Sequence, residues 1–130
     1  LPIKDLSHAT IALVTEGGLV PQGNPDRIEG RWATKYNKYS LEGLTRLSKG
    51  EFESVHRGVD TTFINEDPNR LLPVDVIRDM EREGIIGRLH PYFFTTTGCA
   101  TFVDMCRKIG AGIARELKNA GVEGVILTAT

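Results

Sequence analysis

The chain has 130 residues and a formal net charge of −1, with 16 basic and 17 acidic side chains and two cysteines. This length predicts a single domain, and the balanced charge excludes the strong field with which proteins attract nucleic acid or an anionic membrane. The apolar stretches are too short to span a bilayer, no leader resembles a signal peptide, and the cysteines are few, which together predict a cytoplasmic protein.

The chain opens with one clear strand and a long loop. Residues 9–15 (ATIALVT) are apolar, partly β-branched and followed by Glu16 and two glycines. This pattern predicts a buried parallel strand and a tight turn. Residues 17–39 are rich in Gly, Pro, Asn and charge and predict a long loop, a feature that is often functional.

The middle of the chain predicts a short helix and a weaker strand. Ser40 is expected to cap a helix that buries Leu41, Leu44 and Leu47 at helical spacing. Residues 51–56 (EFESVH) alternate as a strand does, and the polar stretch that follows, up to Arg70, predicts another loop.

The second half of the chain alternates helices and strands. We predict a helix from Pro73 to Gly84, a strand and turn over 92–98, a helix over 100–120 and a last strand over 124–128. The apolar face expected for the long helix consists of Phe102, Cys106, Ile109, Ile113 and Leu117.

Helical segments precede three of the four predicted strands, an order that favours a mostly parallel open sheet with right-handed crossovers. The fold class is therefore predicted to be α/β, with a flavodoxin-like or Rossmann-like three-layer arrangement of one domain over residues 1–130.

Polar residues gather where the predicted strands end. Glu16 follows the first strand, Thr96, Thr97 and Gly98 end the third, and Thr130 ends the last. Open α/β sheets bind ligands at this edge, and free N–H groups after Gly98, expected at the start of a helix, suit a carboxylate. Threonines also end strands for their β-propensity alone, so a purely structural role stays open.

A second polar stretch offers further candidates for binding a small zwitterion. It consists of His56, Arg57, Asp60 and Arg70. In this hypothesis Arg57 or Arg70 helps to hold a carboxylate, while Glu16 faces the amine. A solvated loop has a similar composition, and this alternative also stays open.

The cysteines and histidines point to no metal centre, because none has ligand spacing to another. Cys99, placed at the predicted helix start, is a candidate nucleophile or simply a small residue at a helix entry. Cys106 is expected in the core. The stretch GGLVPQGNP lacks both nucleotide-binding glycine motifs, so no nucleotide is expected.

Longer segments of the chain resemble a known family. IALVTEGGLVPQGNPDRIE, KYSLEGL, the stretch from GEFESVHRG to HPYFFTTTG, and AGVEGVILTAT resemble, in this order, the later part of the selenoprotein B subunit of glycine/sarcosine/betaine reductases. The resemblance covers nearly the whole chain and implies a fragment of a longer subunit.

The resemblance implies chemistry that the residues alone do not. In the family a selenocysteine follows the strand that looks like GVILTAT, so an end at Thr130 is expected from a UGA codon read as a stop or from a designed cut. It implies reductive C–N cleavage of an amino acid or methylated amine, activated on a pyruvoyl group of a companion subunit. A carboxymethyl group then passes from selenium to selenoprotein A. No catalytic residue is expected within the chain itself, and a second copy of the chain is a further candidate partner.

Three alternatives remain on sequence grounds. They are a D-proline reductase-type subunit, a racemase-like enzyme with Cys99 as nucleophile, and a non-catalytic scaffold or docking domain. The segments KYSLEGL and EFESVHRG favour the glycine/sarcosine/betaine group over the first of these.

Overall fold

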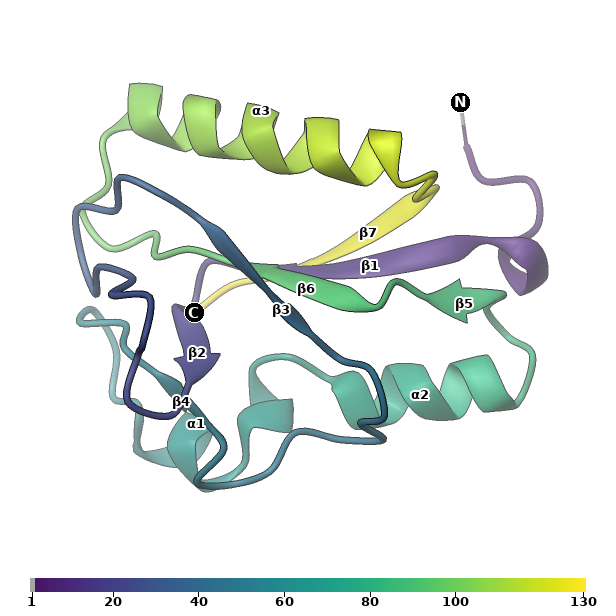
Figure 1. Ribbon diagram of the computed structural model, residues 1–130, viewed down its shortest axis with the longest axis horizontal. Coiled ribbons are helices and arrows are strands. Elements are labelled where there is room, and N and C mark those ends of the chain that lie inside the picture. Colours follow the sequence, from purple (N-terminus) through teal and green to yellow (C-terminus); the bar gives the residue numbers. More distant parts are fainter. Residues whose placement is uncertain (1) are drawn as a thin grey trace.

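The computed structural model describes residues 2–130 and shows a mixed sheet with helices on both faces (Figure 1). The strands are β1 (Thr10–Thr15), β2 (Leu19–Pro21), β3 (Asn37–Ser40), β4 (Phe52–Ser54), β5 (Arg88–Leu89), β6 (Tyr92–Thr95) and β7 (Gly124–Thr128). The α-helices are α1 (Thr62–Glu66), α2 (Val74–Arg82) and α3 (Val103–Asn119), and the 3-10 helices are η1 (Leu6–His8) and η2 (Pro68–Arg70).

Strand β1 lies in the middle of the main sheet. Its residue Val14 pairs in parallel with Phe94 of β6 on one side and with Leu127 of β7 on the other. The short β5 is also parallel to β1, whereas β3 lies antiparallel to β6. The predicted α/β class with a mostly parallel sheet is thereby confirmed, and the flavodoxin-like assignment stays a prediction.

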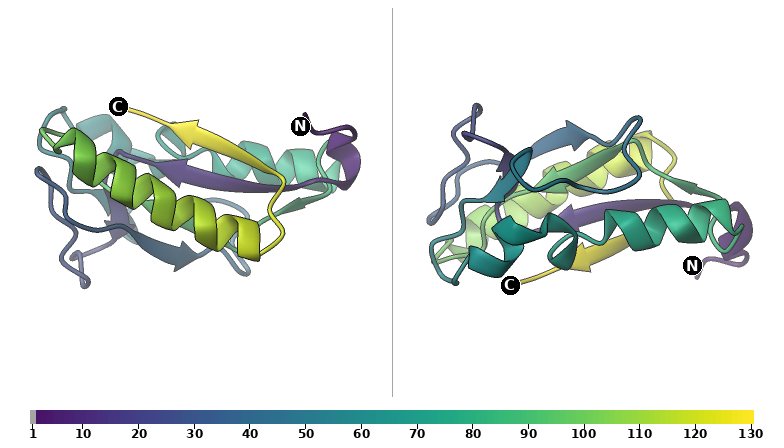
Figure 2. Two further views of the ribbon diagram at one scale, coloured as in Figure 1. Left: turned by 90° about the horizontal axis from the view of Figure 1, so that it is seen from above. Right: turned by 90° about the horizontal axis from the view of Figure 1, so that it is seen from below.

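The core lies in two layers, because successive side chains of β1 point to opposite faces of the sheet. Ala12 and Val14 pack with Phe94 and the buried stripe of α3, which consists of Ile109, Ile113 and Leu117. On the other face, Leu13 packs in the larger cluster on the side of α2. Helix α3 lies over one face and α2 over the other (Figures 1 and 2).

The helix predicted from Ser40 is wrong. Ser40 ends β3, and the segment that follows contains turns, with Gly43 at a φ of +72°. Side chains take the place of helical hydrogen bonds: the Arg78 guanidinium donates to the carbonyls of Leu41 and Leu44, at 2.8 and 2.9 Å. The segment still buries Leu41 and Leu47, so the apolar residues were recognised correctly although the element was not.

Both predicted loops contain regular structure that the sequence pattern did not predict. The first includes β2 and the beginning of β3, and the second includes α1 and η2. Strands β2 and β4 form a separate antiparallel pair below the main sheet (Figure 1). These elements are short, and they are held by tertiary pairing rather than by a periodic apolar pattern.

The apolar face predicted for the long helix is wrong at its start. Helix α3 begins at Val103, so Phe102 precedes it and is 76% exposed. Cys106, expected in the core, is exposed as well, because it lies beside the buried stripe rather than on it.

Between residues 2 and 130, no helix combines the length and the apolar character needed to cross a membrane.

Candidate functional site

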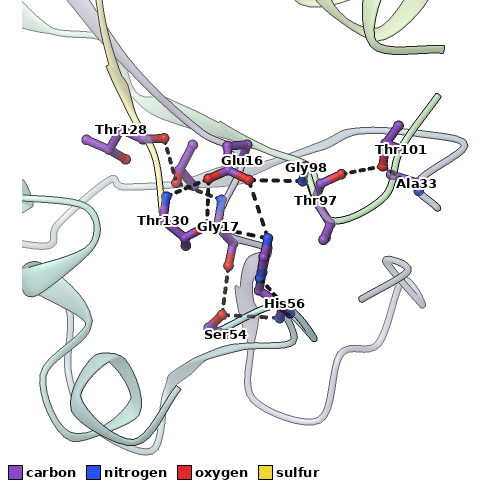
Figure 3. Close-up of polar contacts among 12 residues, drawn as sticks. Glu16, Gly17, Ala33, Ser54, His56, Thr97, Gly98, Thr101, Thr128 and Thr130 are labelled. Carbon is purple, nitrogen blue, oxygen red and sulfur yellow. Dashed lines mark hydrogen bonds and ion pairs between the residues drawn. The ribbon is translucent and has the colours of Figure 1, made fainter. Parts of the chain in front are cut away.

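The carboxyl ends of three parallel strands meet at one edge of the sheet. Glu16 follows β1, Thr97 comes shortly after β6, and Thr130 lies just beyond β7. Because β6 and β7 are both parallel to β1, all three residues lie at the same edge (Figure 3). This arrangement was predicted from the positions of the polar residues and is confirmed.

The Glu16 carboxylate is the centre of this edge. One oxygen, Oε1, accepts hydrogen bonds from the backbone N–H and the hydroxyl of Thr130, at 2.5 and 2.8 Å. The other, Oε2, accepts from the N–H of Gly98 at 3.1 Å and lies 3.4 Å from His56 Nε2. Several donors thus compensate one half-buried carboxylate, which fixes its orientation.

His56 enters the site from the loop after β4, and its tautomer is set by the backbone. The N–H of Gly58 donates to Nδ1 at 3.1 Å, which requires a lone pair on that nitrogen. The ring proton therefore lies on Nε2, which is 3.4 Å from both Glu16 Oε2 and the Thr130 hydroxyl. With its side chain 5% exposed, His56 holds a proton beside the carboxylate and away from bulk water.

A second set of contacts joins the β2–β4 pair to the sheet edge. The Ser54 hydroxyl donates to the carbonyl of Gly17 at 2.7 Å and accepts from the backbone N–H of His56 at 3.2 Å. The Asn65 side chain accepts from the Ser54 N–H at 2.8 Å. These contacts position His56 beneath Glu16 (Figure 3).

Three buried threonine hydroxyls near this edge have no hydrogen-bond partner among the described residues. They belong to Thr95, Thr97 and Thr128, the residues that end or follow β6 and β7. Buried polar groups are normally hydrogen-bonded, and a catalytic or binding role is one of the explanations for an exception. The edge therefore offers unused hydrogen-bonding capacity beside the Glu16 carboxylate.

Gly98 allows the segment that follows β6 to approach Glu16 closely. A Cβ atom at this position would lie only 2.2 Å from Glu16 Oε2, so no larger residue fits without displacing the carboxylate. The sequence interpretation placed Gly98 and Cys99 at the start of a helix, and this is wrong because α3 begins at Val103. The N–H of Gly98 binds Glu16 instead of being free for an anion.

The remaining candidate side chains have partners other than the Glu16 carboxylate. The Arg70 guanidinium contacts Glu66 and the carbonyl of Phe63, away from the strand ends. Asp60 accepts hydrogen bonds from Thr62, which hold the pKa of its carboxyl below the usual value. The exposed Arg57 packs beside Gly30, and the Thr96 hydroxyl donates to the carbonyl of Lys35. Among the described residues, none of these four side chains forms a hydrogen bond or ion pair with Glu16.

Cys99 lies close to the ring of His56. A Cβ atom built on Gly58 would lie 2.9 Å from His56 Cε1 and 3.1 Å from Cys99 Sγ, so the thiol and the ring border the same glycine. The described part of the chain contains no cluster of three or more His, Cys, Asp or Glu residues that could hold a metal ion.

Sequence reasoning missed the residues that support the site. Ser54 was not recognised as a link between the two sheets, although it alternates with His56 along the weak strand signal. Gly58 was not recognised as the group that sets the histidine tautomer. Both act through backbone groups, for which the sequence carries little signal.

Comparison with known proteins gives one consistent result. The family model for glycine/sarcosine/betaine reductase selenoprotein B (GRDB) matches residues 1–130. The chain is 55% identical over 128 residues to "Glycine reductase complex component B subunit gamma" of Carboxydothermus hydrogenoformans, covering 98% of this chain and 29% of that protein.

Two further relatives come from Peptoclostridium acidaminophilum. The sarcosine reductase complex component B subunit beta is 46% identical, and the matched region covers 98% of this chain and 29% of that subunit. The betaine reductase complex component B subunit beta is also 46% identical, and the matched region covers 99% of this chain and 30% of that subunit. The chain thus spans less than a third of these relatives, and no solved structure matches it.

Proposed function

This chain belongs to the glycine/sarcosine/betaine reductase selenoprotein B family, and we propose that it is the part of a reductase subunit that presents the nucleophile at its sheet edge. The reaction of the whole complex would be reductive C–N cleavage of a small amine. Its partners would be a companion subunit that carries a pyruvoyl group and the carrier selenoprotein A.

One observation supports this proposal above the others. Glu16 Oε1 binds both the backbone N–H and the hydroxyl of Thr130, at 2.5 and 2.8 Å, so the chain leaves β7 within a cluster of oriented polar groups. The family resemblance implies a selenocysteine directly after Thr130. That residue would supply the nucleophile, and the pyruvoyl group would supply the electrophile that activates the amine.

The residues around Thr130 suit a selenolate nucleophile at this position. An expelled amine takes up a proton, and His56 holds one on Nε2 close to Thr130. Glu16 carries a negative charge that would oppose an anionic nucleophile, but the donors from Gly98 and Thr130 compensate this charge. The unpartnered hydroxyls of Thr97 and Thr128 are further donors at the same edge. In this proposal Glu16 positions the strand end and His56 carries the proton.

We propose glycine as the substrate among the three amines of the family. The chain is 55% and 52% identical to two glycine reductase subunits, against 46% for the sarcosine and betaine reductase subunits. A full-length subunit tested in the complex should therefore have its highest kcat/KM with glycine. A higher value with sarcosine or betaine would contradict this choice.

The central experiment measures amine-dependent acetyl phosphate formation with the other subunits of the complex supplied. It compares residues 1–130 with a chain extended through the selenocysteine, or through a cysteine in its place. We expect turnover only from the extended chain, because residues that act as a unit in covalent catalysis fail together. Equal turnover by the short chain would mean that the nucleophile lies within residues 1–130, with Cys99 as first candidate.

The role of His56 needs its own variant and a matched control. His56→Gln in the full-length subunit removes the proton carrier, and turnover should fall by roughly 10²-fold or more. His8→Gln replaces a histidine that is exposed and distant, and turnover should stay at the parent level. Equal turnover of both variants would remove His56 from the mechanism, and a scaffold role for this region would then be favoured.

A further inference from the structure

An open apolar groove runs between α3 and β7. Its volume is about 400 Å³, and Cys106, Gly110 and Ala114 of α3 line one side of it. On the other side, Val125 and Leu127 of β7 are 49% and 69% exposed. Seen from above, β7 lies beside α3 at the margin of the sheet (Figure 2, left).

The exposure is restricted to one face of β7. Val125 and Leu127 pair with Ala12 and Val14 of β1, which are buried on the face that α3 covers. Ile126 points to the opposite face and packs against the core on the side of α2. The strand is therefore built for burial on both faces, as strands of parallel sheets are, and one of its faces lacks a cover among the described residues.

Simple dimensions explain why α3 does not supply this cover. A helix is about 10 Å wide and neighbouring strands lie about 4.8 Å apart, so one helix covers about two strands. Helix α3 packs on β6 and β1 through Phe94, Ala12 and Val14. Strand β7 lies beyond its reach, and a second helix beside α3 is needed to bury Leu127.

The side of α3 that faces the groove is suited to such a neighbour. Cys106, Gly110 and Ala114 are four residues apart and lie on one line along the helix. All three are small, and a Cβ atom built on Gly110 would meet nothing within 4 Å. A second helix can therefore approach α3 closely along this line.

We propose that this groove is the seat of a crossover helix from the segment that follows Thr130 in the full-length subunit. Helix α3 joins β6 to β7 across one face of the sheet, and parallel crossovers are right-handed. A further parallel strand added outside β7 requires its crossover helix on that same face, over Val125 and Leu127. The relatives are more than three times as long as this chain, which covers 29% of their length.

This assignment rests on the proposed function, because it takes the chain as part of a longer reductase subunit. Its consequence is that β7 becomes an inner strand with a strand on each side. The crossover helix would begin near the Glu16 carboxylate and would close the groove end formed by Thr96, Thr97 and Gly98.

The test uses thiol alkylation of the full-length subunit, mapped by mass spectrometry. Cys106 lines the groove and is exposed in residues 2–130. The matched control is the thiol introduced by V76C on α2, since Val76 is 53% exposed and lies on the other face of the sheet. We expect Cys106 to react with iodoacetamide at least about tenfold more slowly than the control thiol, at every protein concentration.

Two outcomes would overturn the inference. Equal rates for the two thiols would mean that the groove stays open in the subunit. Protection of Cys106 only at high protein concentration would mean that a second copy of the chain occupies it. The acetyl phosphate assay on the same preparation keeps the two proposals separate: turnover with an open groove removes this inference alone, and a protected groove without turnover removes the proposed function alone.

Discussion

Glu16 and Thr130 lie 114 positions apart in the chain, and one carboxylate oxygen of Glu16 accepts hydrogen bonds from both the backbone N–H and the hydroxyl of Thr130. The contact joins the loop after the central strand to the end of the edge strand. Glu16 therefore holds the end of β7 in place and is also the charged group of the site.

Glu16→Gln should therefore reduce both stability and activity. The amide places N–H groups where the carboxylate accepts from Thr130 or from Gly98, so at least one donor loses its partner. We expect the free energy of unfolding to fall by about 1–3 kcal/mol, measured by urea denaturation. In the full-length subunit, turnover should fall as well.

The control for this substitution is Glu83→Gln, which changes an exposed carboxylate at the end of α2. Its unfolding free energy should stay within about 0.5 kcal/mol of the parent. A Glu16 variant as stable as this control would show that the contacts to Thr130 contribute nothing to the fold.

Gly98→Ala should be destabilising because of one specific contact. The added Cβ would lie 2.2 Å from Glu16 Oε2, so the carboxylate or the backbone has to move. We expect a loss of about 1–3 kcal/mol in the free energy of unfolding. In a Glu16→Ala background the obstacle is absent, and the same substitution should cost much less. Equal costs in both backgrounds would assign the effect to the backbone conformation of Gly98 instead.

Asn69→Ala tests what replaces the helix that the sequence predicted after Ser40. The buried Asn69 side chain accepts from the N–H of Leu47 at 3.0 Å and donates to its carbonyl at 2.8 Å. Removing it leaves two buried backbone groups without a partner and should cost about 2–3 kcal/mol in the free energy of unfolding. Asn119→Ala, at the exposed end of α3, should change stability far less. A similar small effect for both would mean that water replaces the Asn69 side chain.

His90 should give the stability a dependence on pH. Burial, together with the positive charges of Arg88 and Lys38, lowers the pKa of His90 from its usual value of 6.5. Between the lowered pKa of the folded chain and the usual pKa of the unfolded chain, the unfolded chain binds more protons, so a falling pH favours unfolding. The stability contributed by neutral His90 is complete above pH 6.5 and is lost as the pH falls toward the lower, folded-state pKa.

His90→Phe removes this titration and keeps an aromatic ring stacked near Phe94. Urea denaturation above pH 6.5 and about one pH unit below it should show a smaller loss of stability for the variant than for the parent. An identical loss in both proteins would mean that other groups dominate this pH range.

The periodic parts of the fold were predictable and the rest was not. The apolar run of β1 and the helical spacing of Ile109, Ile113 and Leu117 correspond directly to burial. The run of β7 predicted the strand correctly, but Val125 and Leu127 on it are exposed. The segment after Ser40 has the same leucine spacing as a helix, but Gly43 turns the chain and Arg78 binds its carbonyls. Competition from a residue so far along the chain leaves no local pattern.

The residues of the candidate site were likewise predictable only in part. Glu16, Thr97 and Thr130 were found because the ends of parallel strands must share an edge. Arg70 was expected there from its proximity in sequence to His56, yet α1 and η2 carry it to a different surface. The residues that join His56 to the sheet act through backbone donors and acceptors, which every residue type possesses.

The pairing of β7 with β1 has a consequence for how the family can vary. Five consecutive residues of β7 are in register with Ile11 through Thr15, and Glu16 then receives the N–H of Thr130. Inserting or deleting one residue in β7 would shift the chain after it by about 3.3 Å, forward or backward, and turn every later side chain to the opposite face. In the proposed function, the nucleophile expected after Thr130 would then point away from His56 even in a fully folded protein. The proposed function therefore predicts that the length of β7 is constrained by its place at the shared edge, and that changes of length are tolerated only in segments that do not lead to this edge.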